Sequence, residues 1–284
     1  MLASLLIVFR EVLEAGLVVG IVFAATEGIA GRTRWIAAGI AAGAAGASLL
    51  ALFAGALSNA LSGEGQEYFN AAVMLAAVLM LGWHHLWMAD HGRELAKQLK
   101  TLGSEINAGR ASLMAMSIVV ALAILREGSE VVLFLYGIVA ASTDGPVALF
   151  LGGIGGLALG AAVSFALYRG LVAIPTKRLF QVTGVLLTLL AAGLAGQAFA
   201  TLAQVGAVPT LGDEIWNTAW LLRDDTLIGR ALHVITGYTD RPSGIQLLAY
   251  GVTLAAFVVG GKLMHRAHER RNRPILKEPS NEHA

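Results

Sequence analysis

The chain has 284 residues, of which 56% are hydrophobic and 14% charged, and its formal net charge at pH 7 is +1. This composition is far more apolar than that of a soluble globular domain, so it predicts an integral membrane protein. The balanced charge disfavours a nucleic-acid-binding protein, and the absence of cysteine excludes disulfides, thiolate metal ligands and cysteine nucleophiles. No basic segment precedes the first apolar run, so no cleavable signal peptide is expected.

Seven segments are long and apolar enough to be membrane-spanning helices, which need about 20 residues each. In chain order they are 1–29, 35–57, 68–88, 112–142, 146–172, 179–203 and 244–265. The sequence therefore predicts an all-α polytopic membrane protein with one transmembrane domain over 1–265 and a cytoplasmic tail over 266–284.

Charge placement predicts the orientation of these helices. If the tail is cytoplasmic, the inner loops hold most of the lysines and arginines, and the outer loops hold mainly aspartates and glutamates. This distribution follows the positive-inside rule. We therefore expect the N-terminus outside the cytoplasm and the C-terminus inside.

The first segment carries three charges in an apolar run, at Arg10, Glu11 and Glu14. On a helix these positions share an arc of about 100°, so one face is charged and the rest is apolar. Arg10 and Glu14 are four residues apart and can pair, which would leave Glu11 to face another helix.

The fourth segment repeats this pattern as Arg126-Glu127-x-x-Glu130. Repeat 1 then covers about 1–88 and repeat 2 about 112–203, with three helices in each and the seventh helix outside both. An odd number of helices per repeat inverts the second copy in the membrane, which is the arrangement of many secondary transporters.

Bringing the two motifs together would place four carboxylates and two guanidiniums in one buried cluster, with two negative charges in excess. Unpaired buried charge is costly, so such a site is predicted to bind a cation. Carboxylate oxygens suit a hard or borderline metal ion. The alternative is that the Arg–Glu pairs only hold helices together.

The doubled motif, in the first and fourth of seven helices, resembles the oxidase-dependent iron transporter family, which comprises the fungal high-affinity iron permease and the bacterial ferrous iron permeases. The resemblance covers the membrane portion to about residue 265. It implies iron uptake by a bacterial inner-membrane permease, with iron as the transported ion. The two excess charges of the cluster would balance Fe(II), whereas Fe(III) would need a further acid or hydroxide. No cofactor is expected. The resemblance also implies that Glu11, Glu14, Glu127 and Glu130 handle iron beside Arg10 and Arg126, and that separate periplasmic iron-oxidising or iron-binding proteins assist.

Other polar residues are weaker candidates for the iron path. Glu64 and Glu67, in the outer loop between the second and third helices, resemble the family's external capture acids, and Glu27 lies near the inner end of the first helix. A second group crowds the predicted inner end of the third helix, where it could receive iron or mark the membrane boundary; it consists of His84, His85, Asp90 and His91.

The outer stretch 206–243 contains apolar residues spaced as in one or two amphipathic surface helices. Two other functions stay open at this point: transport of Mn(II) or Zn(II), and export of a small molecule. No H-E-x-x-H or G-x-S-x-G motif is present, so no enzyme activity is predicted.

Overall fold

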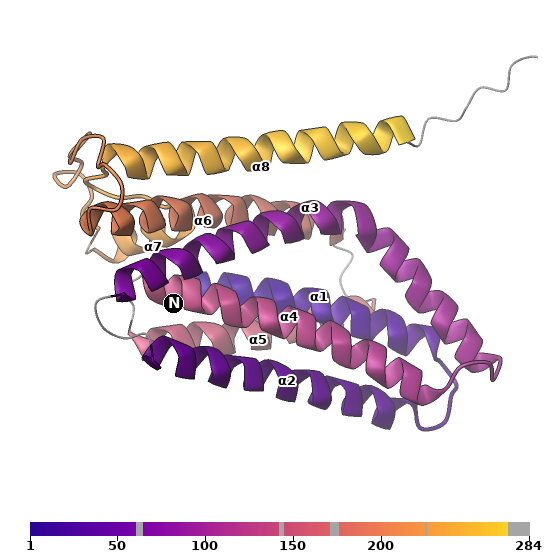
Figure 1. The fold of residues 1–284 in the computed structure, drawn as a ribbon. Coiled ribbons are helices and arrows are strands. Elements are labelled where there is room, and N and C mark those ends of the chain that lie inside the picture. Colours follow the sequence, from indigo (N-terminus) through magenta and orange to yellow (C-terminus); the bar gives the residue numbers. More distant parts are fainter. Residues whose placement is uncertain (61–64, 142–144, 171–175, 225, 272–284) are drawn as a thin grey trace, which may run out of the picture.

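The computed structural model describes residues 1–60, 65–141, 145–170, 176–224 and 226–271. Within these ranges the chain forms eight helices and no strand, as Figure 1 shows. They are α1 (Leu2–Ala25), α2 (Arg32–Ala60), α3 (Gln66–Asn107), α4 (Leu113–Ala141), α5 (Pro146–Tyr168), α6 (Thr176–Gln204), α7 (Leu227–Thr236) and α8 (Gly244–Arg271). The predicted all-α class is confirmed for the described residues.

Each of the seven predicted apolar segments corresponds to one long helix. Among the described residues, four helices are long and apolar enough to cross a membrane, namely α2, α5, α6 and α8. Large apolar side chains stay exposed on all four, such as Leu52 (71% exposed), Phe150 (67%), Val182 (62%) and Val252 (60%). Exposed apolar surface of this extent suits contact with lipid rather than water, so these are the features of a multi-pass membrane protein.

α3 and α8 continue furthest past the C-terminal ends of the membrane spans that the sequence predicts. α3 continues to Asn107, well past the predicted span 68–88, and Figure 1 shows that it changes direction along its length. Its last residue donates a hydrogen bond from Nδ2 of Asn107 to the carbonyl of Ala25, 3.1 Å away at the end of α1. α8 continues to Arg271, into the predicted tail, and residues 272–284 lie outside the described residues.

The outer segment 206–243 is less helical than its apolar spacing predicts. α7 is its only helix among the described residues, and it begins at Leu227 because the hydroxyl of Thr226 accepts a hydrogen bond from the amide of Gly229. The preceding stretch does not form a helix because its amides bond elsewhere: the amide of Ile215 donates to the carbonyl of Pro242 and that of Thr218 to the carbonyl of Asp240. The described part of the segment therefore contains one of the one or two helices that the sequence predicts, and the stretch around Ile215 is not helical.

α1 lies along α5, and α2 lies along α4. We call these two pairs crossed, because each joins one of the first three helices to one of the next three. Glycines allow this close approach. A Cβ atom on Gly156 of α5 would lie 2.5 Å from the carbonyl oxygen of Leu5 in α1, and one on Gly43 of α2 would lie 2.6 Å from that of Ala121 in α4. Only glycine fits backbones this close, as in small-residue contacts between membrane helices.

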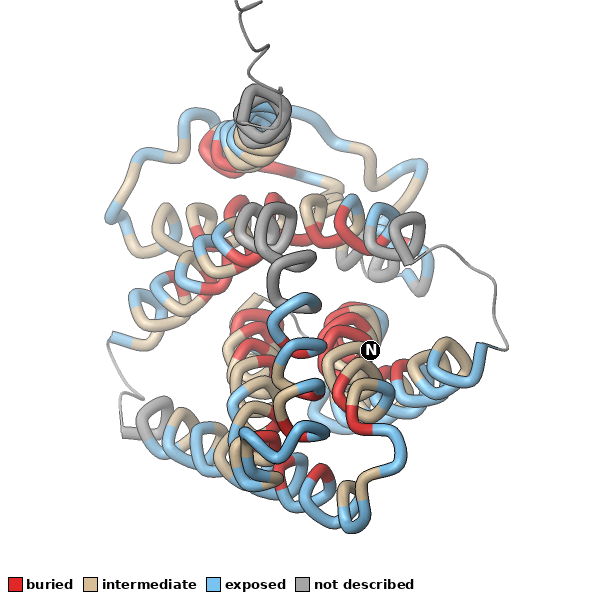
Figure 2. Tube along the Cα trace, turned by 90° about the vertical axis from the view of Figure 1, so that its right-hand side faces the viewer, coloured by how far each residue is buried: buried red, intermediate tan, exposed pale blue. Residues whose placement is uncertain are grey.

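α1 and α4 run in opposite directions and share two apolar clusters. Ile7 near the start of α1 belongs to one cluster with Phe134 near the end of α4. Val22 near the end of α1 belongs to the other with Met116 near the start of α4. Figure 2 shows that the buried positions face the middle of the bundle and the exposed ones face outward. The charged motifs lie between the two clusters along both helices.

Candidate metal site

On α1, the guanidinium of Arg10 binds both acids of its motif. Nη1 donates to Oε1 of Glu11 and Nη2 to Oε1 of Glu14, each at 2.8 Å. All three side chains are buried. The predicted Arg10–Glu14 pair is confirmed. The expectation that Glu11 does not pair with Arg10 was wrong, because the forked guanidinium reaches two carboxylates at once.

On α4, the second motif repeats the pair but holds it more loosely. Nε of Arg126 lies 3.2 Å from Oε1 of Glu130 and 3.8 Å from Oε1 of Glu127. The Arg126 side chain is 36% exposed, against 6% for Arg10, while both glutamates are buried. The hydroxyl of Ser129 donates to the carbonyl of Arg126 at 2.7 Å, so it is engaged within its own helix. The predicted Arg126–Glu130 pair is confirmed.

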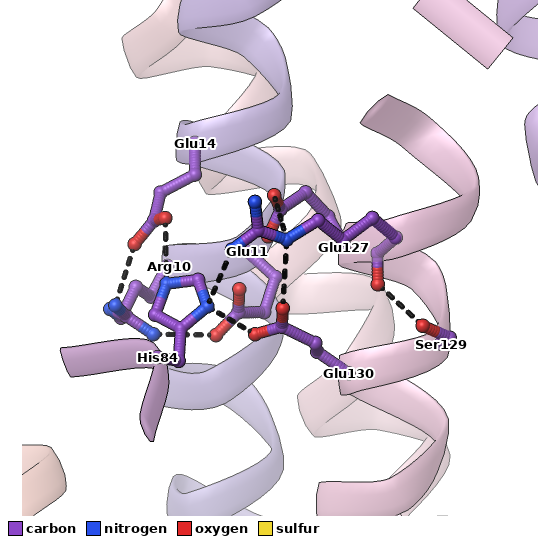
Figure 3. A network of polar contacts seen from close by, with 8 residues as sticks. Arg10, Glu11, Glu14, His84, Glu127, Ser129 and Glu130 are labelled. Carbon is purple, nitrogen blue, oxygen red and sulfur yellow. Dashed lines mark hydrogen bonds and ion pairs between the residues drawn. The ribbon is translucent and has the colours of Figure 1, made fainter. Parts of the chain in front are cut away.

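His84 of α3 joins the two motifs, as Figure 3 shows. Its Nε2 lies 3.0 Å from Oε2 of Glu14 on α1, and its Nδ1 lies 2.5 Å from Oε2 of Glu130 on α4. The residue is 1% exposed. One imidazole therefore connects three helices inside the charged cluster.

The sequence predicts that His84 lies at the inner end of the third helix, whereas the structure buries it between α1 and α4, in a helix that continues to Asn107. A periodic signal was present. The buried residues Ala77 and Leu81 of α3 are followed by His84 at helical spacings of four and three. A histidine that continues a buried apolar face needs a polar partner there. The side chains of His85, Asp90 and His91 lie outside the described part of the structure.

Three carboxylate oxygens in this cluster have no hydrogen-bond partner among the described residues. One of them, Oε2 of Glu130, lies in an ion pair 2.5 Å from Nδ1 of His84. The other two are Oε2 of Glu11 and Oε2 of Glu127, one from each motif. Glu11 is 1% exposed and Glu127 7%. Because an unsatisfied buried carboxylate oxygen is costly, these two atoms are the strongest indication that the cluster accepts a cation.

Four residues of the cluster can offer ligand atoms to one metal ion: one atom from each of Glu11, His84, Glu127 and Glu130 lies within 4.8 Å of the others. Three carboxylates and one imidazole form a mixed oxygen and nitrogen donor set, which suits borderline divalent ions such as Fe(II) and Zn(II). The charge also fits, because the four motif glutamates exceed the two arginines by two negative charges.

The remaining predicted acids do not join this cluster. Glu14 lies beside it but binds Arg10 and His84. Glu27 and Glu67 are exposed, the first after the end of α1 and the second in the first turn of α3. Glu64 lies outside the described residues.

The fold and the buried cluster define a polytopic membrane protein whose inner polar layer comes from two copies of one motif. The model of the Iron permease FTR1 family matches residues 1–268, so the chain belongs to that family.

Three curated relatives illustrate the similarity. Ferrous iron permease EfeU of Escherichia coli O6:H1 (strain CFT073) is 30% identical over 280 residues, which cover 97% of this chain and 100% of the relative. EfeU of Yersinia pestis is 29% identical over 259 residues (89% and 90%), and EfeU of Shigella sonnei is 29% identical over 272 residues (94% and 97%). No solved structure matches the chain. The family and its relatives are permeases, which confirms the prediction that the chain is not an enzyme.

Proposed function

We propose that this chain is an iron uptake permease of the bacterial inner membrane, and that iron passes through a site built by both R-E-x-x-E motifs. The acids that handle iron are Glu11, Glu14, Glu127 and Glu130, with Arg10 and Arg126 balancing part of their charge. One observation carries the site: each motif contributes a buried carboxylate oxygen without a partner to the same cluster. Family membership and the names of the relatives support iron as the ion.

The proposal includes seven membrane-spanning helices, α1 to α6 and α8, in which α1–α3 and α4–α6 form an inverted repeat. The shift of 116 residues that relates the two motifs also relates Leu5 to Ala121. The carbonyl oxygens of these two residues face glycines in equivalent ways, Leu5 facing Gly156 of α5 and Ala121 facing Gly43 of α2. Matching contacts in the crossed pairs α1–α5 and α4–α2 support the repeat, and so does the opposite direction of α1 and α4.

We place the N-terminus in the periplasm and the C-terminus in the cytoplasm, following the positive-inside rule. Residues 1–265 then form one permease domain, with the outer segment 206–243 at the periplasmic face and residues 266–284 as a cytoplasmic tail. In this orientation α3 extends into the cytoplasm and α7 lies outside.

Iron would reach and leave the central site through weaker contacts. Glu64 and Glu67 would gather iron at the outer face, and Glu27 would receive it at the inner face. A separate periplasmic protein would oxidise or deliver the iron, as the family resemblance implies. The polar cluster lies between two apolar clusters, so an ion bound there is shielded on both sides. Transport then requires the two sides to open in turn.

Uptake of radioactive iron tests this function. Cells that lack their own iron importers should take up iron faster when they express the chain, and excess unlabelled iron should suppress this uptake more strongly than equal Mn(II) or Zn(II). Uptake no faster than in cells with an empty vector contradicts the proposal. Stronger suppression by Mn(II) or Zn(II) than by iron assigns the site to that metal instead.

A further inference from the structure

We propose that His84 is a metal ligand of the central site through Nδ1, and that Glu14 is a positioning residue that orients this imidazole. The R-E-x-x-E pattern does not predict either role. His84 comes from α3, outside both motifs, and the pattern gives Glu14 and Glu130 equivalent positions and so no difference in role. The inference rests on the proposed function, since it concerns the same site, and it makes the choice of metal depend on a single histidine.

The two oxygens of Glu14 are already engaged. Oε1 lies 2.8 Å from Nη2 of Arg10, and Oε2 lies 3.0 Å from Nε2 of His84. A carboxylate that holds one imidazole nitrogen fixes the ring orientation and directs the other nitrogen to a metal, an arrangement common around protein metal sites. Glu14 is therefore placed to hold His84, so within the proposed site it acts on the ion through this imidazole and not as a ligand.

The opposite edge of the ring faces the donor atoms. Nδ1 of His84 is directed at Oε2 of Glu130, and Figure 3 shows this edge turned toward Glu130 and away from Glu14. Glu11 and Glu127 complete the set within 4.8 Å, and each has one oxygen without a partner. An ion among these atoms would meet three carboxylates and one imidazole nitrogen.

The nitrogen ligand has a consequence for selectivity. Carboxylate and water ligands suit Mg(II), Ca(II) and Mn(II), whereas imidazole suits Fe, Zn and Ni. With glutamates alone, the cluster would discriminate weakly between Fe(II) and Mn(II). His84 shifts the preference toward Fe(II). A histidine that merely tied α1, α3 and α4 together would leave this preference unchanged.

The test uses His84→Gln in the full-length protein, with His233→Gln as the control. His233 lies in α7, where its Nδ1 contacts the carbonyl of Tyr238 at 2.7 Å, outside the cluster. The measurement, made in cells, is the molar excess of Mn(II) over Fe(II) that halves Fe(II) uptake. We expect this excess to fall at least about tenfold in His84→Gln, which corresponds to about 1.4 kcal/mol of lost preference for Fe(II). In His233→Gln the excess should stay unchanged.

A second readout detects the ligand itself. X-ray absorption at the iron edge, on purified protein without a histidine tag, should show one imidazole bound to Fe(II) in the native chain and in His233→Gln but none in His84→Gln. Iron without imidazole in the native chain overturns the inference. So does an unchanged Mn(II) requirement in His84→Gln cells that still take up iron, and in both cases the iron permease function stands. A native chain that takes up no iron refutes the function instead.

A pair of variants keeps the proposal testable if His84→Gln does not fold. Glu14→Gln retains a side-chain oxygen that can accept the hydrogen bond from His84, while Glu130→Gln removes a charged ligand. We expect Fe(II) affinity to fall by about 10-fold in Glu14→Gln, the low end for residues that support a ligand, and further in Glu130→Gln. Equal losses, or a greater loss in Glu14→Gln, overturn the assignment of roles.

Discussion

Glu11→Gln and Glu127→Gln should each reduce iron uptake at least about 100-fold. Removing a residue that only supports a metal ligand lowers affinity or activity by up to about 100-fold, and these two residues are proposed as ligands themselves. Glutamine keeps the shape of the side chain but removes its charge, so it deprives the site of a ligand and of one excess negative charge. Both variants are needed because the two residues belong to different motifs. The measurement is the initial rate of Fe(II) uptake, normalised to the amount of protein in the membrane.

Glu105→Gln is the matched control for these two variants. It removes a carboxylate from α3 outside the cluster, near the end of that helix, and uptake should stay at the native rate. If either Glu11→Gln or Glu127→Gln retained native uptake, the two motifs would not share one ion. The proposal would then reduce to a site on a single helix.

Gly156→Leu should lower the free energy of unfolding by at least about 3 kcal/mol, which is the upper end of the usual range for overpacking. A Cβ there would lie 2.5 Å from the carbonyl oxygen of Leu5 and 2.8 Å from the amide nitrogen of Phe9, and both are backbone atoms that no rotamer change can move aside. Because α1 carries Glu11, forcing α1 away from α5 should also lower iron uptake. Thermal unfolding in detergent measures the first effect and cellular uptake the second.

Gly153→Leu tests the same substitution three residues earlier in α5. No atom lies within 4 Å of a Cβ at this position, so neither stability nor uptake should fall. Replacing a helical glycine also removes about 0.5–1 kcal/mol of its unfavourable backbone entropy. Equal destabilisation by both variants would show that the close approach of α1 and α5 is not what Gly156 permits.

The long helices could be predicted because each coincides with a run of apolar sequence of the length that a bilayer requires. Charge did not conceal α1 and α4 as helices, since the three charged residues of each lie at helical spacing within apolar sequence. The outer segment was harder. Ile215 lies in sequence whose apolar residues recur at helical spacing. Its amide instead donates a hydrogen bond to the carbonyl of Pro242, 27 residues away, and local periodicity cannot reveal such a partner.

The candidate site was predictable in its acids and not in its histidine. The spacing within each motif indicates the Arg10–Glu14 and Arg126–Glu130 pairs, because residues four apart share a helix face. His84 comes from a third helix, and its contacts depend on how far α3 continues. The division of roles between Glu14 and Glu130 also depends on tertiary structure: the equivalent positions differ because His84 presents a different nitrogen to each.

Anomalous scattering at the iron absorption edge, from crystals of the protein loaded with iron, tests the central claim most directly. The account predicts one strong peak between α1 and α4, within bonding distance of carboxylate oxygens from both Glu11 and Glu127. A peak bound by one motif alone, or these two glutamates turned away from each other, would contradict it.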